Sequence, residues 1–220
     1  MERPDHIVRI DRKGIEKLDK IRRLNFVNSL SGYKAANLIG TASGNGHPNL
    51  AIISSVMHLS SSPAVIGFMQ RPTVVPRHTY QNIKDTGWYT INQIHRGITD
   101  RAHYTSAKFD ENISEFNEAG LTALYEDGYP APYVRESRLR MMVRYLEEYD
   151  VKASNTIMVV GGIEQVQLDQ DAFKPAGGVD HTTLETVCIS GLDSYHFATQ
   201  IAEYSYARPG SFPENLLPDS

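Results

Sequence analysis

The chain has 220 residues, 40% of them hydrophobic, which is enough to bury a core in one domain with helical additions. Lys and Arg number 22 against 26 Asp and Glu, and the resulting net charge of −4 disfavours a nucleic-acid binder that depends on bulk positive charge. Because the chain has one cysteine, Cys188, an intramolecular disulfide and a cysteine-based metal cluster are excluded. We expect Cys188 to be a small residue of the core. Since the N-terminus lacks an apolar leader and no apolar run could span a bilayer, we expect a cytoplasmic protein with no membrane partner.

The first third of the chain changes from a helical to a strand pattern. Apolar residues at helical spacing predict a helix over Gly14–Leu30, which Gly32 would end. Ala36–Ala42 then reads as a strand, and the turn that follows it contains Asn-Gly, typical of a tight hairpin. The return strand is expected over Asn49–Leu59 and a third strand over Ala64–Met69.

The middle of the chain alternates between short helices and a strand. Pro76 suits the first turn of a helix that is expected to run to Asp85, with Gly87 as its C-cap. Trp88–Ile94 is rich in β-branched and aromatic residues and predicts a strand. Short helical pieces are expected over Gly97–Gly120.

The last third contains the clearest strand pattern. Apolar and charged residues alternate over Leu139–Val151, and Asn155–Leu168 reads as the partner strand with a bulge at its Gly-Gly pair. Ser194–Tyr206 is expected to be a helix. Hairpin-linked strands with inserted helices indicate a mainly β protein, a closed or split antiparallel barrel, because a doubly wound sheet would need regular strand–helix alternation.

Strong catalytic and nucleotide-binding motifs are absent from the sequence. No phosphate-binding loop, Gly-x-Gly-x-x-Gly, His-Glu-x-x-His or Gly-x-Ser-x-Gly occurs, and Gly44–Gly46 reads as a hairpin turn. The eight histidines show no convincing metal spacing, and His95 and His103 are separated by a polar loop. We therefore expect no metal site.

Basic and hydroxyl side chains gather at the start of the expected helix at Pro76. Arg77 and His78 are unfavourable at a helix N-terminus, which already has partial positive charge, unless an anion binds there together with Arg71 and Thr79. The alternative is a solvated basic patch without a ligand, and the residues alone leave both interpretations open.

Two further segments offer hydroxyl groups to a ligand. Thr105 and Ser106, beside Lys108, could hold a phosphate, although an ordinary helix-to-loop transition with hydroxyl caps explains them as well. Ser54 and Ser55 interrupt an apolar strand, where a polar ligand or a backbone group would satisfy their hydroxyls.

These segments, in this order, resemble the flavin reductase-like family, whose fold is the FMN-binding split antiparallel β-barrel. The resemblance covers roughly residues 35 to 208 and rests on the order and spacing of short motifs, each of which is unspecific alone. These motifs are Asn37–Thr41, Asn49–Ala51 with Ser54-Ser55, Arg71-Pro72, Arg77–Thr79, Asn82-Ile83, Thr86-Gly87, Asn92, Thr105–Phe109, Ser114–Phe116, Ala119–Thr122 and Glu136-Ser137.

The resemblance implies where a flavin would bind. Residues along the isoalloxazine and ribityl chain would be Asn49, Leu50, Ala51, Ser54 and Ser55. Residues near the phosphate would be Arg71, Arg77, His78 and Thr79, with Thr105 and Ser106 closing the site. The family binds FMN without a covalent bond, usually in a homodimer. Residues 1–33 are expected to be an N-terminal helical extension and 34–220 the split-barrel domain.

The implied function is an oxidoreductase that passes hydride or electrons from NADH or NADPH through bound FMN to an acceptor. Because the flavin supplies the chemistry, no triad or carboxylate pair is needed, and the sequence identifies no catalytic residue. The alternatives are an FMN-binding protein that stores or senses flavin, and a related split-barrel oxidase of a small molecule such as a pyridoxamine. The expected partners are a small-molecule donor and acceptor and a second copy of the chain.

Overall fold

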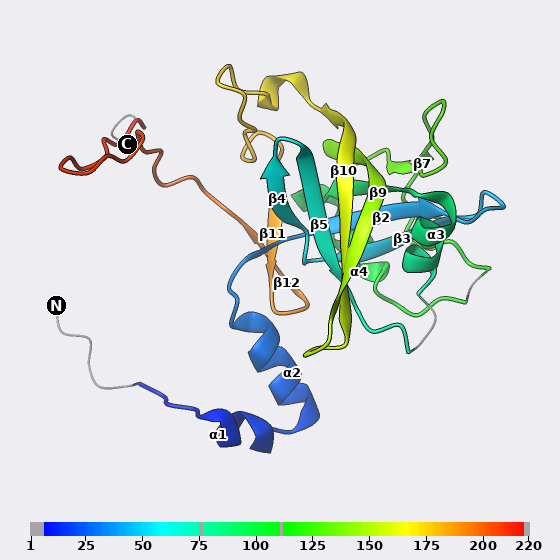
Figure 1. Cartoon of the computed structure of the whole chain (residues 1–220), viewed down its shortest axis with the longest axis horizontal. Coiled ribbons are helices and arrows are strands. Elements are labelled where there is room, and N and C mark those ends of the chain that lie inside the picture. The colour runs from blue at the N-terminus through cyan, green and yellow to red at the C-terminus, as the bar shows by residue number, and fades with distance from the viewer. Residues whose placement is uncertain (1–6, 75–76, 111, 218–220) are drawn as a thin grey trace.

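The computed structural model describes residues 7–74, 77–110 and 112–217. Its centre is a seven-stranded antiparallel sheet in the order β3-β2-β6-β9-β10-β5-β4 (Figure 1). The strands of this sheet are β2 (Asn37–Ala42), β3 (Pro48–Ile53), β4 (Met57–Ser61), β5 (Ala64–Gln70), β6 (Trp88–Gln93), β9 (Leu139–Val151) and β10 (Thr156–Leu168).

The connection between β3 and β4 shows that the sheet curls on itself. These two strands form its opposite edges, yet only residues 54–56 separate them in the chain. The four residue steps from Ile53 to Met57 span at most about 14 Å, whereas the edges of a flat seven-stranded sheet would lie about 28 Å apart. The sheet therefore closes into a barrel that is split between β3 and β4, which confirms the predicted fold class.

Smaller elements surround this barrel. A second sheet has the order β1-β11-β12, and β7 pairs with β8. The smaller strands are β1 (Lys34–Ala35), β7 (Ala123–Leu124), β8 (Tyr133–Val134), β11 (Val187–Ser190) and β12 (Ser194–Phe197). The helices are α1 (Arg12–Lys17), α2 (Lys20–Ser29), α3 (His78–Thr86), η1 (Arg96–Ile98), α4 (Thr99–Tyr104), α5 (Glu115–Glu118) and η2 (Gln170–Ala172).

The buried side chains form three clusters, of which the smallest contains Tyr133 and Met142. In another, Phe68, Tyr89 and Ile91 from the main sheet pack with Ile83 of α3. In the third, strand and helix residues pack together, including Leu50 of β3 and Phe116 of α5. Both α3 and α5 are thus fixed against the β2–β3 hairpin by apolar contact, and this arrangement positions the candidate site.

Most of the predicted elements are confirmed. The expected hairpin joins β2 to β3, with Gly46 at a φ of 80°, and β9 has the predicted bounds. The bulge appears as a register shift between Val160 and Gly161. A side chain at Gly161 would collide with the hydroxyl of Tyr89 and with Val143, so this bend brings the strand close to its neighbours.

Two elements that the pattern predicted as continuous are divided. The expected helix over Gly14–Leu30 is two helices, because the carboxylate of Asp19 accepts hydrogen bonds from the N–H groups of Ile21 and Arg22 and so begins a new helix. The expected strand over Asn49–Leu59 is β3 and β4, separated at the split of the barrel.

The expected helix over Ser194–Tyr206 is wrong. Its first residues form β12, which pairs with β11 from Val187↔Phe197 to Ser190↔Ser194. The rest of the segment is not helical and leaves the barrel as an extended chain (Figure 1). Cys188, on β11, is half-buried, and its thiol lies 3.5 Å from the carbonyl of His196.

Candidate functional site

Strand β3 and helix α3 meet through a side-chain hydrogen bond. The amide Nδ2 of Asn49 donates to Oγ1 of Thr79 over 2.9 Å, and both residues are only 7% exposed. The Thr79 hydroxyl accepts this bond, so its own proton is left to donate to another group. Two segments named by the sequence resemblance, 30 residues apart, are therefore held together by their polar side chains.

The N-terminus of α3 presents backbone donors beside a cation. Arg77 occupies the N-cap position and makes no capping hydrogen bond through its side chain. The first helical bond runs from the N–H of Gln81 to the carbonyl of Arg77, so the preceding N–H groups have no partner within the helix. The Nε of the half-buried Arg77 donates to the carbonyl of Pro72 over 3.2 Å, which leaves its terminal nitrogens for other acceptors. Pro76, expected in the first turn, lies outside the described residues.

Helix α3 is fixed at both ends. Nδ2 of Asn82 donates to Oγ1 of Thr41 on β2 over 3.1 Å, and Gly87 ends the helix in the left-handed conformation at a φ of 76°. On its outer side, Lys84 and Tyr80 bond to Glu148 of β9 at 3.2 and 2.9 Å. The donors at the start of α3 are therefore held on a rigid support.

The remaining residues of β3 contribute mainly backbone. The side chain of Leu50 is fully buried in the core, and its N–H donates to Oε2 of Glu115 over 2.9 Å. Ala51 is half-buried. Leu50 therefore cannot offer its side chain to a ligand on the surface of β3.

The two serines at the split of the barrel differ in their partners. The hydroxyl of Ser55 is within 3.2 Å of the carbonyl and 3.0 Å of the N–H of Met69 on β5, so backbone groups satisfy it. The half-buried Ser54 makes no side-chain hydrogen bond within the described part of the chain, which leaves its hydroxyl for a ligand.

Thr105, Ser106 and Arg71 are the site residues that the structure connects least. Thr105 is buried at the end of α4, where its hydroxyl donates to the carbonyl of Ala102 over 2.8 Å, as a cap would. Ser106 and Arg71 are exposed. Within residues 7–74, 77–110 and 112–217, no hydrogen bond joins these three side chains to β3 or α3.

Glu115 is a residue of this region to which the sequence assigned no role. Burial is the main cause that raises the pKa of its carboxyl above the ordinary value of 4.5, while the N–H of Leu50 and the nearby His78 and His47 act in the opposite direction. The sequence motif at Ser114–Phe116 marked the segment, but no pattern showed that its carboxylate reaches the backbone of β3.

The raised pKa of Glu115 predicts a pH dependence of stability. Because the folded state holds the proton more tightly than the unfolded state, this contribution is complete below about pH 4 and is lost as the pH rises through the folded-state pKa. Glu115→Gln cannot ionise, so the free energy of unfolding of the wild type should fall relative to the variant across this range. Urea unfolding at a series of pH values measures the difference, with Glu118→Gln on the same helix as control. A constant difference would contradict the assignment.

The described residues contain no group of three or more His, Cys, Asp or Glu side chains that could hold a metal ion. None of the described helices is long and apolar enough to cross a membrane. The groups brought together at β3 and α3 are instead amides, hydroxyls, helix N–H groups and a guanidinium. Such a donor set suits a phosphate-bearing ligand.

Comparisons with known proteins agree with this fold. The model of the flavin reductase like domain matches residues 30–184. A split-barrel-domain structure from Shewanella frigidimarina NCIMB 400 is 42% identical, has a TM-score of 0.88, and the match covers 91% of this chain and all of that one.

More distant structures share the fold. Flavoredoxin of Desulfovibrio vulgaris (Miyazaki F) is 22% identical with a TM-score of 0.68, over 82% of this chain and 92% of that one. The NADH:FAD oxidoreductase of Streptomyces globisporus C-1027 is 11% identical with a TM-score of 0.65, over 88% and 99%. The domain match, which spans more than half of the sequence, and the split barrel together show that the chain belongs to the flavin reductase-like family.

Proposed function

We propose that the chain binds FMN and passes hydride or electrons from NADH or NADPH through it to an acceptor, as an oxidoreductase of the flavin reductase or flavoredoxin type. The observation that carries this proposal is the Asn49–Thr79 hydrogen bond, which holds β3 against the uncapped start of α3. A flavin mononucleotide needs a polar wall along its ring and ribityl chain and an anion site at its end, and this junction offers both.

The residues of the chain have a binding role in this proposal. Arg77, the start of α3 and Thr79 hold the phosphate, and Asn49 and Ser54 face the polar edge of the ligand. Bound FMN supplies the electron transfer, so the protein contributes position and hydrogen bonds rather than an acid or a nucleophile. The proposed setting is the cytoplasm, and the proposed assembly is a homodimer.

FMN is proposed over FAD because the donor set is compact and the sequence lacks a dinucleotide fingerprint. The protein is therefore expected to purify with FMN. Heat release followed by mass spectrometry identifies the flavin. Recovery of FAD, which the name of the Streptomyces relative mentions, or no binding after incubation with FMN, would contradict the assignment.

Reduction by a nicotinamide separates the enzyme from a storage or sensor protein. When the protein is mixed with NADH or NADPH in the absence of oxygen, the visible absorption of its flavin is expected to disappear as the flavin is reduced. A control with dithionite shows that the flavin can be reduced at all. Bleaching by dithionite but by neither nicotinamide would favour the protein that only binds FMN.

A further inference from the structure

The C-terminal tail, residues 198–217, has a defined shape that its own chain does not support. It leaves the barrel after β12 and doubles back: the N–H of Ser205 donates to the carbonyl of Glu214 over 2.9 Å, and that of Leu216 donates to the carbonyl of Glu203. Figure 1 shows this doubled segment standing clear of the sheet. A lone two-stranded hairpin is marginally stable in water at best, so its shape calls for a supporting surface.

The apolar side chains of the tail give the same indication. Ile201 is 91% exposed, Tyr206 86% and Phe212 98%. Single exposed apolar residues are normal, but several on one short segment are typical of an interaction surface.

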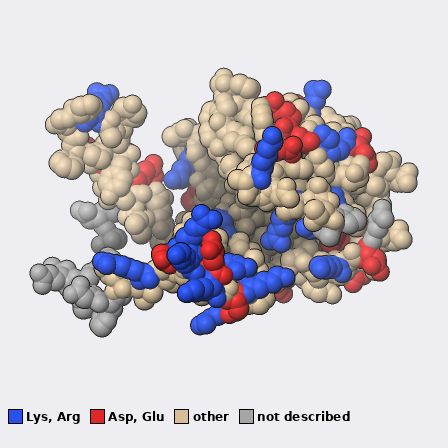
Figure 2. Space-filling view, turned by 60° about the horizontal axis from the view of Figure 1, so that its bottom comes forward, with Lys and Arg blue, Asp and Glu red and all other residues tan. Residues whose placement is uncertain are grey.

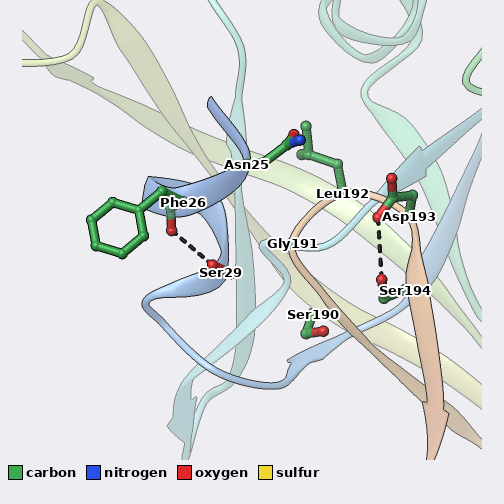
Figure 3. A pocket seen from close by; sticks show the side chains of 8 residues that line it. All are labelled: Asn25, Phe26, Ser29, Ser190, Gly191, Leu192, Asp193 and Ser194. Carbon is green, nitrogen blue, oxygen red and sulfur yellow. Dashed lines mark hydrogen bonds between the residues drawn. The ribbon is translucent and has the colours of Figure 1, made fainter. Parts of the chain in front are cut away.

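The N-terminal arm, residues 7–30, also stands off the barrel, on the same side of Figure 1 as the tail. Among the described residues, the side-chain hydrogen bonds that tie it to the barrel lie at its C-terminal end, where Nζ of Lys34 donates to the carbonyls of Asn28 and Gly191 at 3.1 and 2.9 Å. Between α2 and the β11–β12 turn lies a cavity of about 300 Å³, where Asn25 points toward Leu192 (Figure 3). The exposed apolar residues of α2 are Ile21, Leu24, Val27 and, at its C-cap, Leu30.

Charge separates the arm from the rest of the molecule. Residues 7–30 contain seven Lys and Arg against three Asp and Glu, a net charge of +4, whereas residues 31–220 contain 14 against 21, a net charge of −7. Figure 2 shows the Lys and Arg side chains gathered on the arm. The chain thus carries a basic and an acidic part, a combination that attracts a second copy of itself.

A sheet face of the same chain offers an apolar counterpart. We call the outer face the side of β4, β5, β9 and β10 toward which a Cβ at Gly67 or at Gly162 would point. The two glycines share this face because Gly67 pairs with Val160, and Val160 lies two residues before Gly162 on the same strand. Leu59 lies 2.9 Å from the Cβ position of Gly67, and Leu146 3.6 Å from that of Gly162. The exposed apolar residues of the outer face are Met57, Leu59, Leu146 and Tyr149, each more than one third exposed.

The Shewanella structure shares at least part of the arm or the tail. The 9% of this chain that lies outside the match is fewer residues than the two segments have together. At least part of one of the two segments is therefore common to both proteins.

We propose that the tail and the arm of one copy pack against a second copy of this chain, with the apolar tail on its outer face and the basic arm against the part formed by residues 31–220, which has a net negative charge. The inference rests on the homodimer proposed above and does not depend on the flavin. Each copy gives its two ends to the other, so the exposed apolar residues of both become buried in the pair.

Substitutions in the tail test the proposal, because a residue that is almost fully exposed in one copy contributes little to the stability of that copy but much to a dimer in which it is buried. In wild-type protein, light scattering is expected to show a dimer whose melting temperature rises with concentration. Phe212→Asp and Ile201→Asp should each raise the dissociation constant at least roughly tenfold. The matched control is Val74→Asp, at a residue 83% exposed outside both segments, which should leave the dimer unchanged.

The arm is tested by charge. Lys20→Glu reverses a charge at the first position of α2 and should weaken the dimer more at low salt than at high salt. A dimer that all these variants leave intact would overturn the inference, as would a monomeric wild type. Flavin binding, measured separately, decides the proposed function in either case.

Photo-crosslinking identifies the surface that the tail contacts. Phe212 is replaced by benzoylphenylalanine, and equal amounts of ¹⁴N- and ¹⁵N-labelled protein are mixed before irradiation. Crosslinks that join the two isotopes at β4 or β9 support the proposal. Crosslinks within one isotope alone would overturn it. The proposal would also be overturned if the wild-type protein bound to anionic phosphatidylserine vesicles and Phe212→Asp abolished this binding.

Discussion

Arg77→Ala is expected to weaken FMN binding roughly 10- to 150-fold, because a charge-assisted contact of about 1.5–3 kcal/mol is lost. Riboflavin, which has no phosphate, should lose little affinity. The side chain is half-buried, its Nε is held by the carbonyl of Pro72, and it lies beside helix N–H groups without partners in the helix. A charge placed on such a support loses little freedom when it meets an anion.

Fluorescence titration of the apoprotein with both flavins, at low and high salt, measures this effect. Arg71→Ala is a useful companion, because Arg71 is exposed and lies outside the helix, and its loss should be smaller. Thr105→Ala should also have a smaller effect, since its hydroxyl already donates to Ala102. If Arg77→Ala weakened FMN and riboflavin equally, or neither, Arg77 would be a solvated surface charge.

Gly40→Ala is expected to lower the free energy of unfolding by about 1–3 kcal/mol, which corresponds to a fall in melting temperature of about 2–4 °C per kcal/mol. A Cβ at this position of β2 would collide with the backbone carbonyl of Pro132 and lie 2.5 Å from Oγ1 of Thr90. Neither group can move freely. Thr90 donates to Pro132 over 2.6 Å and accepts from Asn92 over 2.8 Å.

The hairpin turn after β2 provides the matched control. Gly44 has no atom within 4 Å of its Cβ position, so Gly44→Ala makes the same chemical change in open space. Its unfolding free energy should stay within about 0.5 kcal/mol of the wild type. Chemical denaturation of both variants compares them directly. Equal stability of Gly40→Ala and Gly44→Ala would show that β2 and Pro132 can separate at little cost.

The sequence predicted most strands because their patterns are local. The alternation over Leu139–Val151 and the Asn-Gly turn each need only neighbouring residues, and both are confirmed. The break at Asp19 was missed because the apolar spacing continues across it, although the aspartate is itself a helix start signal. The segment from Ser194 was wrongly predicted as a helix because its strand forms by pairing with β11. In that pairing Cys188 lies opposite His196, eight residues later in the chain.

The candidate site was only partly accessible to the sequence. The cluster at Arg77–Thr79 could be predicted from the mismatch between positive side chains and a helix N-terminus. The bond from Asn49 to Thr79, the bond from Leu50 to Glu115 and the Ser55 bridge to Met69 join residues 14 to 65 positions apart. Such contacts depend on how the barrel closes, which periodicity does not encode. For Thr105 the capping alternative describes the geometry of its hydroxyl.

The short link at residues 54–56 limits how far the two edges of the split barrel can separate. β3 is registered on β2 up to Ile53, and β4 is registered on β5 from Met57, so both ends of the link are fixed. One added residue would have to bulge out, or turn every side chain of β4 to the opposite face. Insertions and grafted loops therefore belong at the open hairpin turn around Gly44, where extra residues do not change the distance between the edges of the barrel.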